Sequence, residues 1–586
     1  MDVLHLTEQE FQQRLKAHIE KIYGKSDLEL ILKNISTVFA NKQPAYEKSD
    51  NQIQKKQLQE EWSQKDIYLI TYGNSILSGK RKPLKVLLDF LNKYLKGVVT
   101  TVHVLPFFPY SSDDGFAVID YKQVNSGLGD WHDIENISKH FDLMADLVIN
   151  HISSQSKWFK QFIKNEQPGC EYFIQAEQQE ALSKVVRPRA SKLLQAVETK
   201  AGTKHVWCTF SADQVDVDFS NPAVLLEFIK ILIFYMEKGV RVIRLDAIAF
   251  LWKSVGTTCI NLPETHEIVK VFRLLIERYY PRAIFVTETN IPNMENLKYF
   301  GNSNEAHIIY NFSLPPLLLH AMWSGTSEHL VRWSMSLPPA PRNCTYLNFT
   351  ASHDGIGLRP LEGILDDETT DALAVGMKKF GGEISARSIT SAGERPYEIN
   401  ITWMDAMKGT ESGEDALQIQ RFLCSQIIML GLEGIPAFYI HSLLAGENDY
   451  EKLSQTKHKR SINRGQWNFE ELEKMFSDYT SKNCKVFHDL KRIITIRNKQ
   501  AAFHPSATQF TLHLGKNIFG FWRQSVDREQ SIFAIHNVTN MQQELYLANI
   551  NLICTDTWVD LIAWDTLDLS NESIVLKPYQ CLWISN

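Results

Sequence analysis

The stretch from Gly239 to Ala247 constrains the fold of this chain more than any other. Its apolar and β-branched residues follow a helix-like run, 225–238, and end at Arg244 and Asp246. An apolar run of this length predicts a strand that is buried on both faces, as in a parallel sheet. Because side chains alternate along a strand, Arg244 and Asp246 lie on the same side. Two such charges at the carboxyl end of a parallel strand indicate an active site, although a purely structural ion pair would produce the same pattern.

Seven further runs of the same kind occur along the chain, and helical patterns lie between several of them. The eight predicted strands are 67–72, 98–105, 143–149, 240–245, 283–288, 307–312, 346–349 and 434–440. Strands that alternate with helices indicate a parallel sheet. Eight of them predict an α/β fold of the closed (β/α)8 type, the TIM barrel.

The remaining segments predict additions to this barrel. Two gaps between predicted strands are too long for simple loops, so we interpret them as inserted subdomains above the catalytic face. Short strands after residue 503 predict a C-terminal antiparallel β domain. Near the N-terminus, Thr7 and Glu10 fit a helix capping box. The predicted domains are an N-terminal helical extension (1–62), the catalytic barrel (63–151, 221–354 and 413–502), inserted subdomain B (152–220), inserted subdomain B′ (355–412) and the β domain (503–586).

Composition excludes several classes of protein. The net charge of −6 and the lack of a basic tract argue against a nucleic-acid partner. No apolar run reaches the roughly 18 residues of a membrane span. The first residues have neither a basic segment nor an apolar core, so we expect no signal peptide. The eight cysteines form no C-x-x-C pair and are expected to be reduced. We therefore expect a cytoplasmic protein, and its oligomeric state stays open.

Polar and charged residues gather where the predicted strands end. They are Asp113, Asp146, Asn150, His151, Arg244, Asp246, Glu288, His353 and Asp354. Each buried charge costs several kcal/mol unless it is paired. A structural role for all of them at one face of the barrel is therefore disfavoured.

Carboxylates combined with an arginine and two histidines suit the chemistry of glycosidic bonds. A retaining enzyme needs a nucleophilic carboxylate and a carboxylic acid, roughly 5–5.5 Å apart. Arg244 would keep Asp246 ionised, whereas Glu288 has no adjacent cation and suits the acid/base role. Asp354 would stabilise the oxocarbenium-like transition state. A metal hydrolase fits less well, because the histidines lack the close spacing of a metal-binding helix.

Four segments make a specific resemblance. Residues 146–151, 239–247, 287–290 and 352–354 resemble the four signature regions of the α-amylase superfamily, glycoside hydrolase family 13, and the resemblance extends over residues 66–586. It implies Asp246 as nucleophile, Glu288 as acid/base and Asp354 as transition-state stabiliser. It also implies that Arg244, His151 and His353 bind the glucosyl unit.

Further segments resemble the sucrose phosphorylase branch of that family. They are 105–109, 112–116, 187–189, 214–218, 314–320, 353–357 and 462–464. The resemblance implies that Asp113 and Arg464 pair and hold the O4 and O6 edge of the glucosyl unit, in a subsite that includes Phe116 and Gln214. It also implies that Arg189 contributes to binding phosphate, and a guanidinium suits that anion.

Other segments depart from the sucrose phosphorylases and are more similar to the glucosylglycerate phosphorylases of the same subfamily. These are Thr289-Asn290 after the acid, the segment 358–360, and the loop 393–398, which carries Arg395, Tyr397 and Glu398. We expect these three loop residues near the phosphate and acceptor, and Arg395 suits an anionic acceptor such as glycerate.

The resemblance implies a reversible, retaining phosphorylase. It would convert 2-O-α-D-glucosyl-glycerate and inorganic phosphate to α-D-glucose 1-phosphate and D-glycerate through a β-glucosyl-aspartate, with no metal or organic cofactor. A phosphorylase of sucrose, sucrose 6-phosphate or glucosylglycerol, an amylase-like hydrolase, and a non-catalytic sugar-binding barrel remain alternatives.

Overall fold

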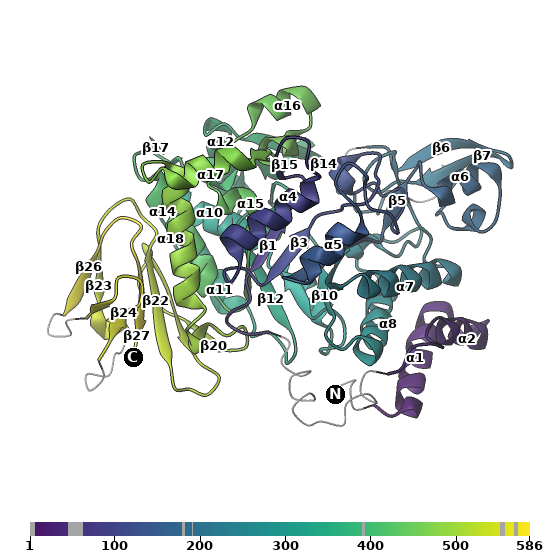
Figure 1. Ribbon diagram of the computed structural model, residues 1–586, viewed down its shortest axis with the longest axis horizontal. Coiled ribbons are helices and arrows are strands. Elements are labelled where there is room, and N and C mark those ends of the chain that lie inside the picture. The colour runs from purple at the N-terminus through teal and green to yellow at the C-terminus, as the bar shows by residue number, and fades with distance from the viewer. Residues whose placement is uncertain are drawn as a thin grey trace.

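The structure is a computed structural model that describes residues 6–44, 62–177, 182–189, 191–389, 393–550, 557–567 and 572–586. A barrel occupies the middle of the molecule (Figure 1). The C-terminal β domain lies on one side of it, and the two N-terminal helices lie on the other side.

Eight parallel strands close into the barrel. In spatial order they are β1 (Tyr68–Thr71), β3 (Thr101–Val104), β4 (Asp142–Val148), β9 (Val240–Asp246), β10 (Ile284–Thr287), β11 (Ile308–Tyr310), β12 (Thr345–Phe349) and β18 (Ile435–Tyr439). Each coincides with one of the eight predicted strands, so the predicted barrel is confirmed. Nearly every residue of these strands is buried, because the helices cover the outside and side chains fill the inside.

Helices surround the barrel and lead into its strands. They include α4 (Pro83–Phe90), α5 (Trp131–Ser138), α7 (Pro222–Glu237), α8 (Pro263–Tyr279), α10 (Leu314–Ser324), α11 (Glu328–Ser336), α14 (Gln418–Gly431) and α18 (Lys482–Arg497). The connection from α7 to β9 needs Gly239, whose φ is +86°. A Cβ there would lie 2.4 Å from the Ser138 hydroxyl, so the tight turn into β9 depends on glycine.

Two long segments stand above the carboxyl ends of the strands. Between β4 and β9 the chain forms β5 (His151–Ser153), α6 (Lys157–Lys164), β6 (Leu194–Thr199), β7 (Gly202–Trp207) and β8 (Gln214–Asp216). Between β12 and β18 it forms β13 (Ile356–Gly357), α12 (Asp367–Lys379), β14 (Glu383–Ile389) and β15 (Gly393–Asn400). β13, β15 and β14 make a small sheet. The exact limits of the inserted subdomains stay a proposal.

After the barrel the chain forms an antiparallel sheet, as predicted. Its order is β20 (Thr508–Thr511), β21 (Ile518–Gln524), β22 (Ser531–Asn537), β27 (Cys581–Ser585), β24 (Val559–Asp560) and β25 (Asp565–Thr566), and a separate hairpin pairs β23 (Gln543–Tyr546) with β26 (Ser573–Leu576). The domain is joined firmly to the barrel, because the buried Arg523 donates to the carbonyl of Gly431 at the end of α14.

The N-terminal extension packs against the barrel through α1 (Glu8–Tyr23), and α2 (Leu28–Val38) follows. The predicted capping box is present, since the Thr7 hydroxyl accepts from the Glu10 N–H and Glu10 accepts from the Thr7 N–H. His18 and Glu267 of α8 are 2.6 Å apart. Residues 45–61 of the predicted N-terminal helical extension lie outside the described residues.

Two further expectations concern the whole chain. Among the helices that the structure describes, none is both long enough and apolar enough to cross a membrane. None of the seven described cysteines forms a disulfide bond, and Cys554 lies outside the described residues.

Candidate active site

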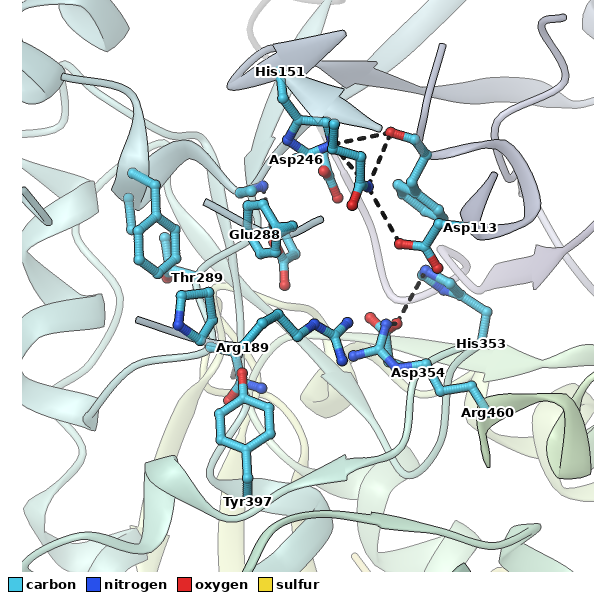
Figure 2. A pocket seen from close by; sticks show the side chains of 18 of the residues that line it. Asp113, His151, Arg189, Asp246, Glu288, Thr289, His353, Asp354, Tyr397 and Arg460 are labelled. Carbon is cyan, nitrogen blue, oxygen red and sulfur yellow. Dashed lines mark hydrogen bonds and ion pairs between the residues drawn. The ribbon is translucent and has the colours of Figure 1, made fainter. Parts of the chain in front are cut away.

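A pocket opens at the carboxyl ends of the barrel strands, beneath the inserted segments (Figure 2). Ten of the fourteen predicted site residues line it. They are Asp113, Phe116, His151, Arg189, Gln214, Asp246, Glu288, His353, Asp354 and Tyr397. Asp246, Glu288 and Asp354 form what we call the carboxylate end of the pocket. Arg189, Asn290, Arg359 and Tyr397 form what we call the arginine end.

Arg244 lies below the carboxylate end and is buried. Its Nη1 is 2.7 Å from Asp246 Oδ1 and also contacts Asp146, the residue beside it on β4. Its Nη2 is 3.9 Å from Glu288 Oε1. Alternation along β9 thus places Arg244 and Asp246 on one side, as the sequence predicts. One guanidinium faces three carboxylates.

Glu288 follows β10 directly and reaches across to the end of β9. Its Oε2 accepts a hydrogen bond from the N–H of Ala247, at 3.0 Å. Ala247 has a left-handed backbone, with φ +53°, immediately after Asp246. A non-glycine residue in this conformation is strained, and such strain is typical of functional sites. The hydrogen bond fixes the acid candidate beside the nucleophile candidate.

Burial raises the pKa of Asp246 well above its usual range, and the negative charge of Glu288 adds to the rise that Arg244 opposes. Burial raises the pKa of Glu288 as well. Asp146 stays ionised, because His103 and Arg244 overcome the effect of burial and lower its pKa to about 2. Arg244 acts in the expected direction, because its positive charge and its hydrogen bond favour the ionised form of Asp246. Arg244 divides its charge among several carboxylates, and the Asp246–Glu288 pair can retain a proton.

Asp354 differs from that pair. Burial acts to raise its pKa, but the guanidinium groups of Arg460, Arg464 and Arg244 together hold the pKa of Asp354 well below its usual range. Arg460 contacts Asp354 directly. The carboxylate is therefore ionised and suited to stabilising positive charge.

Arg460 was not predicted from the sequence. It lies in the 3₁₀ segment η9 (Lys459–Asn463), and its guanidinium donates to both carboxylate oxygens of Glu398. Arg460 Nε and Nη2 lie 3.0 and 2.6 Å from the two Glu398 oxygens. Glu398 is thereby occupied and 1% exposed, so the structure does not bring it to the arginine end, where we expected it. The only sequence signal for Arg460 was its position four residues before Arg464.

Aromatic and amide groups form another part of the pocket wall. The Phe116 ring stacks on His353, with centroids 4.9 Å apart and planes 4° apart. The Gln214 side chain donates to Asp113 Oδ2 at 3.3 Å and lies 3.1 Å from His151 Nε2. Burial lowers the pKa of both histidines, so they are neutral hydrogen-bonding groups.

The predicted pairing of Asp113 with Arg464 is not present. Arg464 Nη1 is 2.6 Å from Asp114 instead, and its Nε donates to the His353 carbonyl. Asp113 and Asp114 have φ of +54° and +47°. In this tight left-handed turn the side chains of Asp113 and Asp114 point in different directions. Asp113 faces the pocket, whereas Asp114 and Arg464 line an adjoining cavity.

The arginine end also differs from the prediction. Arg189 and Tyr397 line it, but Arg395 points outward, is 41% exposed in its side chain, and lies 2.5 Å from Asp367 of α12. A β-bulge explains this. Ser385 pairs with Glu398 and Ala386 with Pro396, so Tyr397 is the extra residue. The bulge breaks the alternation that would otherwise place Arg395 and Tyr397 on the same side. Arg359 and Asn290 line the pocket in its place.

Comparisons with known proteins identify the family of this chain. Residues 87–337 match the family model described as "Alpha amylase, catalytic domain". Glucosylglycerate phosphorylase of Spirochaeta thermophila is 42% identical and covers 89% of this chain and 90% of its own. Glucosylglycerate phosphorylase of Escherichia coli is 36% identical over 98% of this chain and 100% of its own. The crystal structure of sucrose 6F-phosphate phosphorylase from Thermoanaerobacter thermosaccharolyticum superposes with a TM-score of 0.70 at 24% identity, over 88% of this chain and 98% of that one.

Proposed function

This chain belongs to the glycoside phosphorylases of the α-amylase family, glycoside hydrolase family 13, and we propose that its substrate is 2-O-α-D-glucosyl-glycerate. It would be cleaved reversibly by inorganic phosphate to α-D-glucose 1-phosphate and D-glycerate. The observation that carries this proposal is the combination of groups that line one pocket. The carboxylates Asp246, Glu288 and Asp354, which suit glucosyl transfer, line it together with Arg189 and Arg359, whose guanidinium groups suit phosphate and a carboxylate acceptor.

In the first step, an oxygen of Asp246 attacks the anomeric carbon while the bond to the glycerate oxygen breaks. Glu288 gives its proton to that oxygen, and its raised pKa keeps the proton available near neutral pH. Arg244 balances the charge on Asp246 before the attack. The ionised Asp354 stabilises the oxocarbenium-like transition state.

In the second step, a phosphate oxygen attacks the same carbon and Asp246 leaves as a carboxylate. Glu288 takes the proton from the attacking phosphate, which restores its protonated form. Two inversions retain the α configuration, so the product is α-D-glucose 1-phosphate. Arg189 would hold the phosphate in line. Neither step calls for a metal ion or an organic cofactor.

None of the described cysteines forms a disulfide bond, which supports a further proposal, that the protein works in the cytoplasm.

A panel of acceptors offered with α-D-glucose 1-phosphate, with phosphate release as the readout, tests the substrate. The panel contains D-glycerate, glycerol, fructose and fructose 6-phosphate. We expect glycerate to react about 5- to 150-fold faster than the neutral acceptors, because these leave a desolvated guanidinium unpaired. Fructose or glycerol reacting as fast as glycerate would reassign the enzyme to one of the sister phosphorylase activities.

A further inference from the structure

Three arginines line the pocket, but they do not have the same capacity to bind an anion. Arg460 is occupied, because Asp354 and both oxygens of Glu398 surround its guanidinium. A substrate carboxylate would have to displace one of these buried partners. Only Arg189 and Arg359 among the pocket arginines are therefore candidates.

Arg359 is held at the pocket wall by the small sheet of the inserted segment. β13 pairs with β15, and the N–H of Leu358 donates to the carbonyl of Tyr397 at 3.0 Å. Arg359 begins the 3₁₀ turn η8 (Arg359–Leu361) that follows. Its side chain is 11% exposed. The position is therefore fixed by backbone hydrogen bonds rather than by the side chain's own partners.

The Arg359 guanidinium is incompletely satisfied. Among the residues that the structure describes, its buried Nε has no hydrogen-bond partner. The nearest carboxylate oxygen, on Glu362, is 3.9 Å away and belongs to a side chain that is 43% exposed. A desolvated cationic donor without a close acceptor is unfavourable, and an anionic ligand would relieve this.

Asn290 supplies a complementary group beside it. Asn290 comes two residues after Glu288, the proposed acid, so it borders the place where the leaving oxygen departs. Its side chain packs over Gly357, where a Cβ would lie 2.6 Å from Nδ2. Its Oδ1 is buried and has no hydrogen-bond partner in the described structure. Gly357, two residues before Arg359, has no side chain and thus leaves room for the Asn290 amide, whose Oδ1 is an unsatisfied acceptor.

We propose that Arg359 binds the carboxylate of the acceptor and that Asn290 Oδ1 accepts a hydrogen bond from one of its hydroxyl groups. The site would select small hydroxy acids over neutral polyols, and it leaves Arg189 for phosphate. This assignment rests on the proposed function. It replaces Arg395, which is paired on the outside of the β14–β15 hairpin.

The test compares Arg359→Gln with the matched control Arg395→Gln, which removes an arginine from the same inserted segment but outside the pocket. The rates of glucosylation of D-glycerate and of glycerol from α-D-glucose 1-phosphate are measured for both variants. We expect Arg359→Gln to lower kcat/KM for glycerate at least about 10-fold, with the rate on glycerol nearly unchanged. Arg395→Gln keeps the selectivity of the parent.

Other outcomes overturn the assignment. Retention of glycerate selectivity in Arg359→Gln, or its loss in Arg395→Gln, refutes the role of Arg359. An equal loss on both acceptors means that Arg359 only supports the fold. If the glutamine variant does not fold, Arg359→Lys decides, since it should keep part of the preference for glycerate with a higher KM. A parent enzyme that does not prefer glycerate refutes the proposed function itself, before any variant is compared.

Discussion

The two ends of the pocket are built on different parts of the fold. At the carboxylate end, Asp246 is the last residue of β9, and Glu288 and Asp354 follow β10 and β12 closely. At the arginine end, Arg189, Arg359 and Tyr397 come from segments inserted between strands. Strand register fixes the first set, whereas bulges and turns decide the second. The carboxylate end therefore tolerates little change, and the arginine end is the place where related enzymes can differ in acceptor.

We expect the largest loss of activity from a change at Asp246, which belongs to the carboxylate end. Asp246→Asn keeps the size of the side chain but removes the nucleophile, while Arg244 keeps Asp146 as a partner. We expect turnover to fall about 10⁴-fold or more, with little change in fold. Phosphate release with α-D-glucose 1-phosphate and glycerate measures the rate, and thermal unfolding checks the fold. Near-parent rates in the purified variant would contradict the double-displacement mechanism.

The difference between the two ends of the pocket also explains which features of the molecule could be predicted from the sequence. The eight strands were recognisable because each is a short apolar run, and polar or charged residues follow several of them. The shared side of Arg244 and Asp246 followed from alternation alone. Regular structure carries its geometry in the residue pattern, so a motif at a strand end predicts a place in space.

The arginine end was not predictable in this way. The bulge at Tyr397 turns Arg395 away from the pocket, and its position depends on pairing with β14. The choice between Asp113 and Asp114 as partner of Arg464 depends on a left-handed turn. Arg460 was missed because its role depends on Glu398, a contact between residues far apart in the sequence.

A smaller effect is expected where the two ends meet, at Arg460. This arginine contacts Asp354 and contributes to the low pKa of that carboxyl group. Arg460→Gln should raise the pKa of Asp354, because the largest cause that lowers it is removed. Because a lowered pKa keeps Asp354 ionised in acid, the variant protonates this group at a higher pH. The acid limb of the pH profile of kcat/KM should then move to higher pH, with the largest fractional loss of activity at the acid end of the profile.

The parent enzyme and Arg395→Gln serve as references for this profile, since Arg395 is paired with Asp367 and lies outside the pocket. A variant that loses the same fraction of activity at every pH would show that Arg460 supports the site without setting the charge of Asp354.

The smallest effect is expected at Arg189, at the arginine end. Arg189 reaches into the pocket from the side of Tyr397 (Figure 2). Its proposed contact is with phosphate, which binds as a separate molecule after the glucosyl-enzyme forms. Arg189→Ala should therefore raise the KM for phosphate about 10-fold, the effect of losing one charge-assisted contact.

The first step uses groups at the carboxylate end, so its rate should change little. Slow hydrolysis of the glucosyl-enzyme, measured without phosphate, needs the groups at the carboxylate end but no bound phosphate, so it should persist in the variant. If hydrolysis falls as much as phosphorolysis does, Arg189 acts on the carboxylate end as well and the two ends are not independent. If the parent enzyme releases glucose at the same rate with and without phosphate, the arginine end does not direct phosphate to the intermediate, and the pocket is that of a hydrolase.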